Sequence, residues 1–515
     1  MKLGYSVGKR TVGAEVELKL ATSKRGLQQA MALPWLKRQA NDVSRKQELT
    51  SVYFDTDDFV LREHDISLQV RKTGKQRLQT IKANSGALLA REEWETEIDS
   101  DEPKLELARD TELASLLTAK LTKQLKPMFE TRVERVVIPL HIGDSDIELA
   151  FDQGCVATAG ATRELAEIEI ELKHGDRSEL ARLARKLARI APVTLSVRAK
   201  AELGYALLDG ALDAPVFAEP VMIAQQATVA DAFATVGFAC LRQIAGNEGA
   251  VRNGDPEGIH QMRVGLRRMR AALSLFKDML HDRKVKGLKR ELKWLTEQLG
   301  PARDFDVFVS KTLTPYRAKH PDLQEFEILE HDLERTRSAG FATARAAAES
   351  ERFRSLLLDC ALWLLDGDWR NDTDALTQAL RKRPARAFAQ DELARRIRKV
   401  SKRGRKLERL DWRKRHKLRI AVKKVRYGRE FFATLCSDGR KAGRKLDRAL
   451  KELQSELGIL NDMRVHLERA REFASAGKAA KMAFAIGCLT GREETSASDV
   501  LTKALAARKR LQKAT

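Results

Sequence analysis

The sequence ELAEIEIELK, residues 164–173, decides the fold of the first half of the chain. Charged and apolar residues alternate along it, and strict alternation is typical of a half-buried β-strand. Side chains two positions apart point to the same side of a sheet, so Glu167, Glu169 and Glu171 share one face. The isoleucines and leucines between them face a hydrophobic layer.

The same alternation recurs in other segments before residue 210. It is present in residues 13–20 (GAEVELKL), 66–72 (ISLQVRK) and 78–82 (LQTIK), and helical patterns lie near residues 24–33, 110–122 and 178–191. We therefore predict an α+β domain over residues 1–210, built on an antiparallel sheet or β-barrel. Its charged face is either solvated or lines a barrel as a polar tunnel. Such a tunnel is costly unless a charged ligand fills it.

The charged faces mix carboxylates with lysine and arginine, which suits a metal-bound triphosphate. The anion needs basic hydrogen-bond donors, and Mg²⁺ or Mn²⁺ needs oxygen ligands. Oxygen ligands could come from Glu15, Glu17, Asp152, Glu169 and Glu171. Hydrolysis of such a ligand depends on positioning and charge neutralisation, and it requires no nucleophilic side chain.

A segment with two prolines, residues 211–225, separates this half from a second one with helical periodicity. Long charged amphipathic segments follow it, and we predict an all-α domain of helical bundles over residues 226–515. The chain of 515 residues carries a formal net charge of +22, a field that attracts polyanions without selecting among them.

The N-terminus lacks the apolar run of a signal peptide, and no uninterrupted apolar stretch is long enough to span a bilayer. The five cysteines have neither metal-binding nor redox spacing and are expected to be reduced thiols. These features predict a cytoplasmic protein with no membrane partner, and they leave its oligomeric state open.

The helical half contains an internal two-fold repeat. HQMRVGLRRMR at residues 260–270 is matched by HKLRIAVKKVR at residues 416–426. Further on, LGPARDFDV at residues 299–307 is matched by LGILNDMRV at residues 457–465. Two copies of one bundle are therefore expected to pack together.

Each copy carries a basic row on one helix face, because its members fall within a sector of about 80°. The rows are His260, Arg263, Arg267 and Arg270, and His416, Arg419, Lys423 and Arg426. The row is either a solvated face or the site of an anion that offsets the repulsion of its stacked charges. Aromatic residues make up 6% of the chain, and we find none interleaved with this face and no helix-turn-helix or zinc-finger pattern. A linear phosphate chain therefore suits the rows better than nucleic acid.

The strand half resembles the CYTH family, the triphosphate tunnel metalloenzymes, over roughly residues 10–210. The resemblance lies in an ordered set of motifs: EVELK (15–19), YFDT (53–56), LQVR (68–71), TIK (80–82), REEW (91–94), IELAFDQG (147–154), EIEIEL (167–172) and Lys200. A single ExExK motif is weak, whereas the ordered set is specific.

The CYTH resemblance implies roles for residues of this chain. The implied metal ligands are Glu15, Glu17, Asp152, Glu169 and Glu171, and the implied catalytic group is Glu15, Glu17 and Lys19. The residues implied to bind phosphate are Lys19, Arg71, Lys82, Arg91, Arg132, Arg135 and Lys200. Arg132 and Arg135 compete for one or two family positions. Where the family usually has arginine, two residues before Arg71, this chain has Gln69, so one phosphate contact is uncharged or comes from elsewhere.

The repeated His-x-x-Arg helix resembles the CHAD family over roughly residues 225–510. Arg303-Asp304 and Asn461-Asp462 match the second element of that family. The resemblance implies that both basic rows bind inorganic polyphosphate in a groove between two bundles. Because Asn461 stands where the first copy has Arg303, the groove is expected to be asymmetric.

A CYTH unit joined to a CHAD unit resembles a known bacterial two-domain arrangement, which implies hydrolysis of inorganic triphosphate to pyrophosphate and phosphate. One alternative is that the same tunnel acts on thiamine triphosphate or nucleoside triphosphates. Another is a non-catalytic scaffold that only binds polyphosphate. All five implied metal carboxylates are present, which favours an enzyme.

Overall fold

A computed structural model of the chain describes residues 16–40, 44–87, 90–108, 117–436, 440–475 and 480–514. The chain forms two compact units. The strand unit comprises Met1–Val216, Leu241–Gly249 and Ser350–Gly367, and the helical unit comprises Phe217–Cys240, Ala250–Glu349 and Asp368–Thr515. Two pieces of the helical half thus belong to the strand unit, where α14 (Glu351–Asp366) packs against α5 and β9.

Nine strands of the strand unit form one antiparallel sheet in the order β5-β4-β3-β2-β6-β7-β8-β1-β9. They are β1 (Val16–Ala21), β2 (Arg45–Asp55), β3 (Ile66–Thr73), β4 (Gln76–Ala87), β5 (Ala90–Ile98), β6 (Lys126–Ile142), β7 (Ser145–Ala157), β8 (Thr162–His174) and β9 (Thr194–Leu195). The alternating segments of the sequence lie in β1, β3, β4 and β8, so the prediction from period two is confirmed there.

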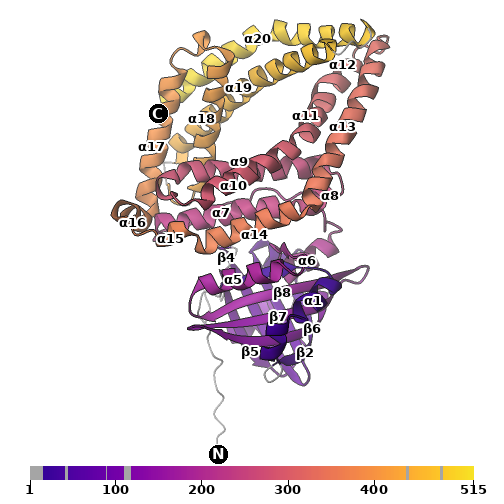
Figure 1. Cartoon of the computed structure of the whole chain (residues 1–515), viewed down its shortest axis with the longest axis vertical. Coiled ribbons are helices and arrows are strands. Elements are labelled where there is room, and N and C mark those ends of the chain that lie inside the picture. The colour runs from indigo at the N-terminus through magenta and orange to yellow at the C-terminus, as the bar shows by residue number, and fades with distance from the viewer. Residues whose placement is uncertain are drawn as a thin grey trace, which may run out of the picture. The chain divides into compact units, whose positions relative to one another are not determined.

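Alternation gives the sheet two chemically different faces. Leu18, Ile168 and Ile170 are buried in an apolar layer, and α1 (Lys24–Met31) and α5 (Arg177–Ala188) pack on this part of the sheet. The charged side chains of the other face line one cavity, to which each of the strands β1 to β8 contributes. The sheet therefore curves around its own interior, as Figure 1 shows, and the predicted polar tunnel is confirmed.

Helix α6 (Lys200–Leu208) places Lys200 at the edge of this cavity, and an aromatic cluster holds the helix there. The ring of Tyr205 meets Phe129 edge-on with centroids 5.0 Å apart, and Phe129 stacks on Tyr53 at 4.7 Å. The Tyr205 hydroxyl donates a 2.7 Å hydrogen bond to Asp55. The other helices before residue 210 are α2 (Pro34–Ala40), α3 (Val60–Glu63) and α4 (Ala119–Thr122).

Three helices were expected in this half from the sequence pattern. Those near residues 24–33 and 178–191 correspond to α1 and α5. Of the one expected at 110–122, the structure describes only the last turn, α4, because residues 109–116 lie outside the described part of the chain.

The second half is helical from Val229 onward, as its periodicity predicts. Its helices are α7 (Val229–Gly246), α8 (Glu248–Arg252), α9 (Pro256–Leu275), α10 (Lys284–Gln298), α11 (Gly300–Phe308), α12 (Thr314–Arg317), α13 (Glu325–Glu349), α14, α15 (Asp368–Asn371), α16 (Ala375–Lys382), α17 (Ala385–Gly404), α18 (Trp412–Phe431), α19 (Arg440–Ser475) and α20 (Ala480–Ala514). The two longest, α19 and α20, run side by side in Figure 1.

The two copies of the repeat begin in the same way. Asp255 caps α9 by accepting hydrogen bonds from two backbone N–H groups of its first turn, and Asp411 caps α18 by accepting one from Lys414. Such caps satisfy donors that have no partner within a helix. Each helix then runs for 20 residues, and α9 packs against α18.

Residues 211–227, all of them described, contain neither helix nor strand. The five cysteines are free. No helix that the structure describes is both long enough and apolar enough to cross a membrane.

Gly154 in β7 lies where neighbouring strands approach closely. A Cβ at this position would lie 1.9 Å from the carbonyl oxygen of Arg132 in β6, so a side chain forces the strands apart. We expect Gly154→Ala to lower the free energy of unfolding by about 1–3 kcal/mol in urea denaturation. Gly160→Ala is the matched control, because a Cβ there meets no atom within 4 Å. Equal unfolding midpoints for the two variants would contradict the close approach of the strands.

Candidate functional site

The inner face of the sheet surrounds a cavity of about 270 Å³. Its basic lining residues are Lys19, Arg71, Lys82, Arg135, Lys173 and Lys200, and its acidic lining residues are Glu17, Glu93, Glu95, Glu148, Glu169 and Glu171. Six cationic side chains therefore meet six carboxylates, and the charged lining is neutral as a whole. Tyr53, Ser67 and Gln69 add uncharged polar groups.

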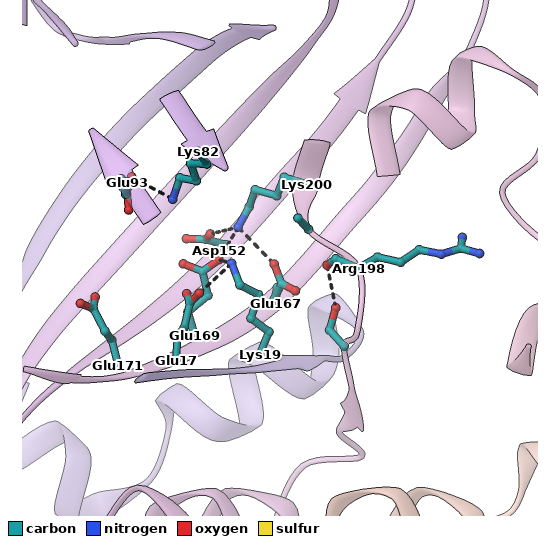
Figure 2. A network of polar contacts seen from close by, with 12 residues as sticks. Glu17, Lys19, Lys82, Glu93, Asp152, Glu167, Glu169, Glu171, Arg198 and Lys200 are labelled. Carbon is teal, nitrogen blue, oxygen red and sulfur yellow. Dashed lines mark hydrogen bonds and ion pairs between the residues drawn. The ribbon is translucent and has the colours of Figure 1, made fainter. Parts of the chain in front are cut away.

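Glu169 is the most heavily contacted carboxylate of this cavity, and it lies in β8 between β1 and β7 (Figure 2). Its Oε1 atom is 2.9 Å from Lys19 Nζ and 2.6 Å from Lys200 Nζ. Its Oε2 atom is 2.5 Å from a guanidinium nitrogen of Arg135. The three cations come from β1, α6 and β6, so one carboxylate connects three elements to β8.

Two further carboxylates extend the network. Asp152 is fully buried, accepts two hydrogen bonds of 2.7 Å from Arg135 and lies 2.8 Å from Lys200 Nζ. Glu167 lies 3.1 Å from the same lysine nitrogen. Three carboxylates are thus matched by three cations, and buried charges are tolerated only when they are paired in this way.

The network shifts the pKa values of Glu169, Lys19 and Lys200 toward their charged forms. Burial alone would raise the pKa of Glu169, but Lys19, Lys200 and Arg135 together hold it well below its usual range. Burial would lower the pKa values of Lys19 and Lys200, and the neighbouring carboxylates, Glu169 first, raise both instead. Glu169 and the two lysines are therefore charged at neutral pH.

The buried carboxylates have the donor chemistry of a divalent-cation site. Oxygen atoms of Asp152, Glu167 and Glu169 lie within 4.8 Å of one another. Glu17 and Glu171 lie on the adjoining cavity wall. Carboxylate oxygens are ligands that Mg²⁺ and Mn²⁺ take, so the residues fit such an ion.

Most residues predicted for this site lie together. Those that line the cavity are Glu17, Lys19, Arg71, Lys82, Arg135, Glu169, Glu171 and Lys200, and Asp152 is bonded to two of them. Arg132, which the family resemblance places among the phosphate-binding residues, does not line the cavity. Its side chain is 66% exposed and forms an ion pair with Glu130. It is three residues from Arg135, an odd number, so the two arginines point to opposite faces of β6. Glu15 and the side chain of Arg91 lie outside the described residues.

Among the residues that the structure brings to this site without a role implied by the sequence are Glu167, Lys173 and Tyr53. The first two share the inner face of β8 with Glu169 and Glu171, so the alternation that marks those glutamates also marks them. Tyr53 belongs to the YFDT motif, and its inward position depends on long-range stacking against Phe129.

The helical unit repeats one polar contact in both copies. On α9, Arg263 lies 3.5 Å from Asp304, and on α18, Arg419 lies 3.8 Å from Asp462. In each copy the aspartate belongs to the second repeated motif. The correspondence between the motifs is therefore present in space as well as in sequence.

The copies differ where Asn461 replaces Arg303. The side-chain oxygen of Asn461 lies 2.5 Å from His416 Nδ1. In the first copy, burial and then the charge of Arg303 lower the pKa of His260 to about 4, so this histidine is neutral at pH 7. Its Nδ1 atom is buried without a hydrogen-bond partner among the described residues. The two copies thus differ in the hydrogen bonding of their histidines.

Basic side chains of the two rows crowd one another. Burial, followed by the charges of Arg419 and Arg267, lowers the pKa of Lys423 to about 7. Since Arg267 belongs to α9 and Lys423 to α18, the rows lie within electrostatic reach of each other. Within the described part of the chain, the buried Nε atoms of Arg263, Arg267 and Arg419 have no hydrogen-bond partner. Of the outer row members, Arg270 is exposed and Arg426 is half-buried.

Fold and site together define a two-domain protein in which a charged tunnel precedes a repeated basic helical domain. The model of the CYTH domain matches residues 13–205, and the model of the CHAD domain matches residues 236–471. The chain is 31% identical to the CHAD domain of the plant Ricinus communis, over 57% of this chain and 96% of that one, with a TM-score of 0.50. The chain therefore belongs to the CHAD family and carries a CYTH domain before its CHAD domain.

A curated relative is similar to part of the chain. An inorganic triphosphatase of Haemophilus influenzae is 28% identical over 196 residues, which is 38% of this chain and 54% of that protein. The chain thus spans about half the length of this relative.

Lys200 contacts three buried carboxylates, so its removal is expected to destabilise the strand unit. We predict that Lys200→Met lowers the free energy of unfolding by about 3–5 kcal/mol at pH 7, because it leaves buried charge unpaired. The low pKa of Glu169 contributes stability above its unfolded pKa of about 4.3, and this is lost as pH falls through the folded value. In Lys200→Met the pKa of Glu169 is expected to rise. The loss of unfolding free energy should therefore be smaller at pH 5 than at pH 7, because protonation of the carboxylate relieves the unpaired charge.

Urea denaturation at pH 7 and pH 5 measures this difference. Lys46→Met is the matched control, because its ion pair with Glu134 is exposed on both sides and contributes little. A deficit for Lys200→Met that is the same at both pH values would contradict the role assigned to the carboxylates.

Proposed function

We propose that the strand unit hydrolyses inorganic triphosphate to pyrophosphate and phosphate in a metal-dependent reaction. The observation that carries this proposal is the neutral cavity lining of six basic and six acidic side chains. A polyanion alone would leave the carboxylates unpaired, and a divalent cation alone would leave the lysines and arginines unpaired. A complex of the two satisfies both sets, because phosphate oxygens accept from the basic groups and the metal takes the carboxylates.

The basic lining residues would bind the phosphates and neutralise the charge that develops in the transition state. They are Lys19, Arg71, Lys82, Arg135, Lys173 and Lys200, and they come from five strands and α6. Donors from several sides fix the triphosphate in one orientation, which is most of what phosphoryl transfer needs from a protein.

The carboxylates would hold the metal. The described members of the set are Glu17, Asp152, Glu167, Glu169 and Glu171, and Glu15 remains a further candidate. When bound, Mg²⁺ or Mn²⁺ supplies charge neutralisation and lowers the pKa of an attacking water. Lys19, Lys200 and Arg135 would then exchange their carboxylate partners for phosphate oxygens.

Two observations favour inorganic triphosphate over a nucleoside or thiamine ester. Among the described cavity residues the only aromatic is Tyr53, whose ring already stacks on Phe129, so no pair of rings can sandwich a base. The similarity to the Haemophilus influenzae inorganic triphosphatase points to the same substrate.

For the helical unit we propose binding of inorganic polyphosphate along the two basic rows. The residues concerned are His260, Arg263, Arg267, Arg270, His416, Arg419, Lys423 and Arg426. The lowered pKa of Lys423 and the unpaired Nε atoms reflect cations that the protein itself does not fully compensate. A phosphate chain would supply both the missing charge and the missing acceptors.

Removal of one metal-binding carboxylate tests the tunnel. We expect Glu17→Gln to lower metal-dependent phosphate release from inorganic triphosphate roughly 100-fold, because it removes an anionic ligand without changing side-chain volume. The control is Glu134→Gln, in which the carboxylate is 59% exposed in β6 and does not line the cavity. Full turnover by Glu17→Gln would show that Glu17 is not a ligand of the catalytic metal.

Removal of one arginine from each row tests the division of function. Arg263→Ala combined with Arg419→Ala is expected to weaken the binding of long-chain polyphosphate at least tenfold and to leave triphosphate turnover unchanged. Arg290→Ala with Lys293→Ala changes the net charge equally at exposed positions of α10. If this control weakens binding as much, the rows are not a site, and only the overall field attracts polyphosphate.

A further inference from the structure

An exposed tryptophan extends the second basic row by one turn at the start of α18. Trp412 is the first residue of α18 and its side chain is 47% exposed. At about 100° per residue, it lies four residues and 40° from His416, and it falls near the middle of the sector that the row occupies. No aromatic residue is interleaved with the row, but Trp412 extends the same face by one turn.

The tryptophan is a difference between the two copies. The first copy has Pro256 at the corresponding position, directly after its capping aspartate. Proline suits the first position of a helix, because its missing N–H is not needed there. Neither cap geometry nor helix start therefore requires an aromatic residue in the second copy.

Helix α19 packs against α18 and contacts it beside the second basic row. The guanidinium carbon of Arg464 is 5.5 Å from the centroid of the Trp412 ring, and that of Arg413 is 5.4 Å from it. One turn further along α18, Asn461 of α19 contacts His416. Trp412 thus belongs to the seam between α18 and α19 in which the row of cations begins.

We propose that this end of the helical unit binds the base of a nucleoside polyphosphate, whose phosphate chain continues along Arg419 and Lys423. The inference rests on the proposed binding of phosphate chains by the same row. Trp412 is 47% exposed and offers a surface for base stacking, and the guanidinium groups of Arg413 and Arg464, which lie over its ring, offer donors to the first phosphates. The inorganic chain and the nucleotide would share the cations, and only the nucleotide would use Trp412.

The spacing along the helix favours a mononucleotide over a nucleic-acid strand. Arg419 and Lys423 lie 7 and 11 residues beyond Trp412, which is roughly 10–16 Å at 1.5 Å per residue. A base followed by three or four phosphates spans such a distance. A single strand needs successive aromatics for successive bases, and α18 has no second aromatic residue between Trp412 and Arg426.

Calorimetric titration of the full chain in EDTA, with adenosine 5′-tetraphosphate and with inorganic tetraphosphate, tests the proposal. We expect Trp412→Ala to weaken the nucleotide about tenfold and to leave the inorganic chain unchanged, since stacking contributes only to the former. Trp412→Phe should retain most of the nucleotide affinity. Ile420→Ala is the control, because this exposed apolar residue lies on α18 about 80° from Trp412. Nucleotide that binds in the tunnel of the strand unit is expected to bind equally to the unaltered chain and to the three variants, so it does not affect the comparison.

The outcomes separate this inference from the function on which it rests. If inorganic tetraphosphate binds but Trp412→Ala weakens both ligands equally or neither, the base site is refuted and the phosphate site stands. If neither ligand depends on Arg419, the phosphate site itself fails. Photolabelling with 8-azidoadenosine triphosphate adds a direct readout: label in α18 or α19 is expected, and label confined to the strand unit would overturn the proposal.

Discussion

The ion-pair network around Glu169 is the constraint on which the strand unit depends. One carboxylate in β8 contacts Lys19, Lys200 and Arg135, which belong to β1, α6 and β6. A shift of register by one residue would place these side chains on the other face of the sheet and leave buried charge unpaired. The network therefore fixes how the strands pair, and the groups that fix it are also those suited to a metal and a polyanion. Stability and binding are properties of the same contacts.

The helical unit has the opposite electrostatic character. The strand cavity is neutral because every cation meets a carboxylate, whereas the rows on α9 and α18 hold an excess of positive charge. Asp304 and Asp462 offset one arginine in each row at 3.5 and 3.8 Å. Burial, and after it repulsion from Arg419 and Arg267, lowers the pKa of Lys423. A protein keeps such repulsion when a ligand compensates it, so the two units suit a metal–anion complex and a bare polyanion, respectively.

Period two and the internal repeat were sufficient to predict the fold class, because each is a local property of the sequence. That Glu169, Lys19 and Lys200 share one site, although these residues are far apart in the chain, was implied only by the resemblance to the CYTH family. The sequence did not show which of Arg132 and Arg135 faces the cavity, because that depends on how β6 pairs with its neighbours. Nor did it show that α14 packs in the strand unit, because this placement depends on tertiary contacts. Trp412 was missed because the row was taken to begin at its histidine, one turn after the helix actually starts.

We propose that the cavity of the strand unit acts on a complex of triphosphate with a divalent cation. Phosphate release by the unaltered chain from inorganic triphosphate and from ATP, with Mg²⁺, with Mn²⁺ and with EDTA, tests this proposal. We expect turnover of triphosphate that requires the metal and is well above the turnover of ATP. Absence of turnover with either metal, or turnover that EDTA does not abolish, would contradict it.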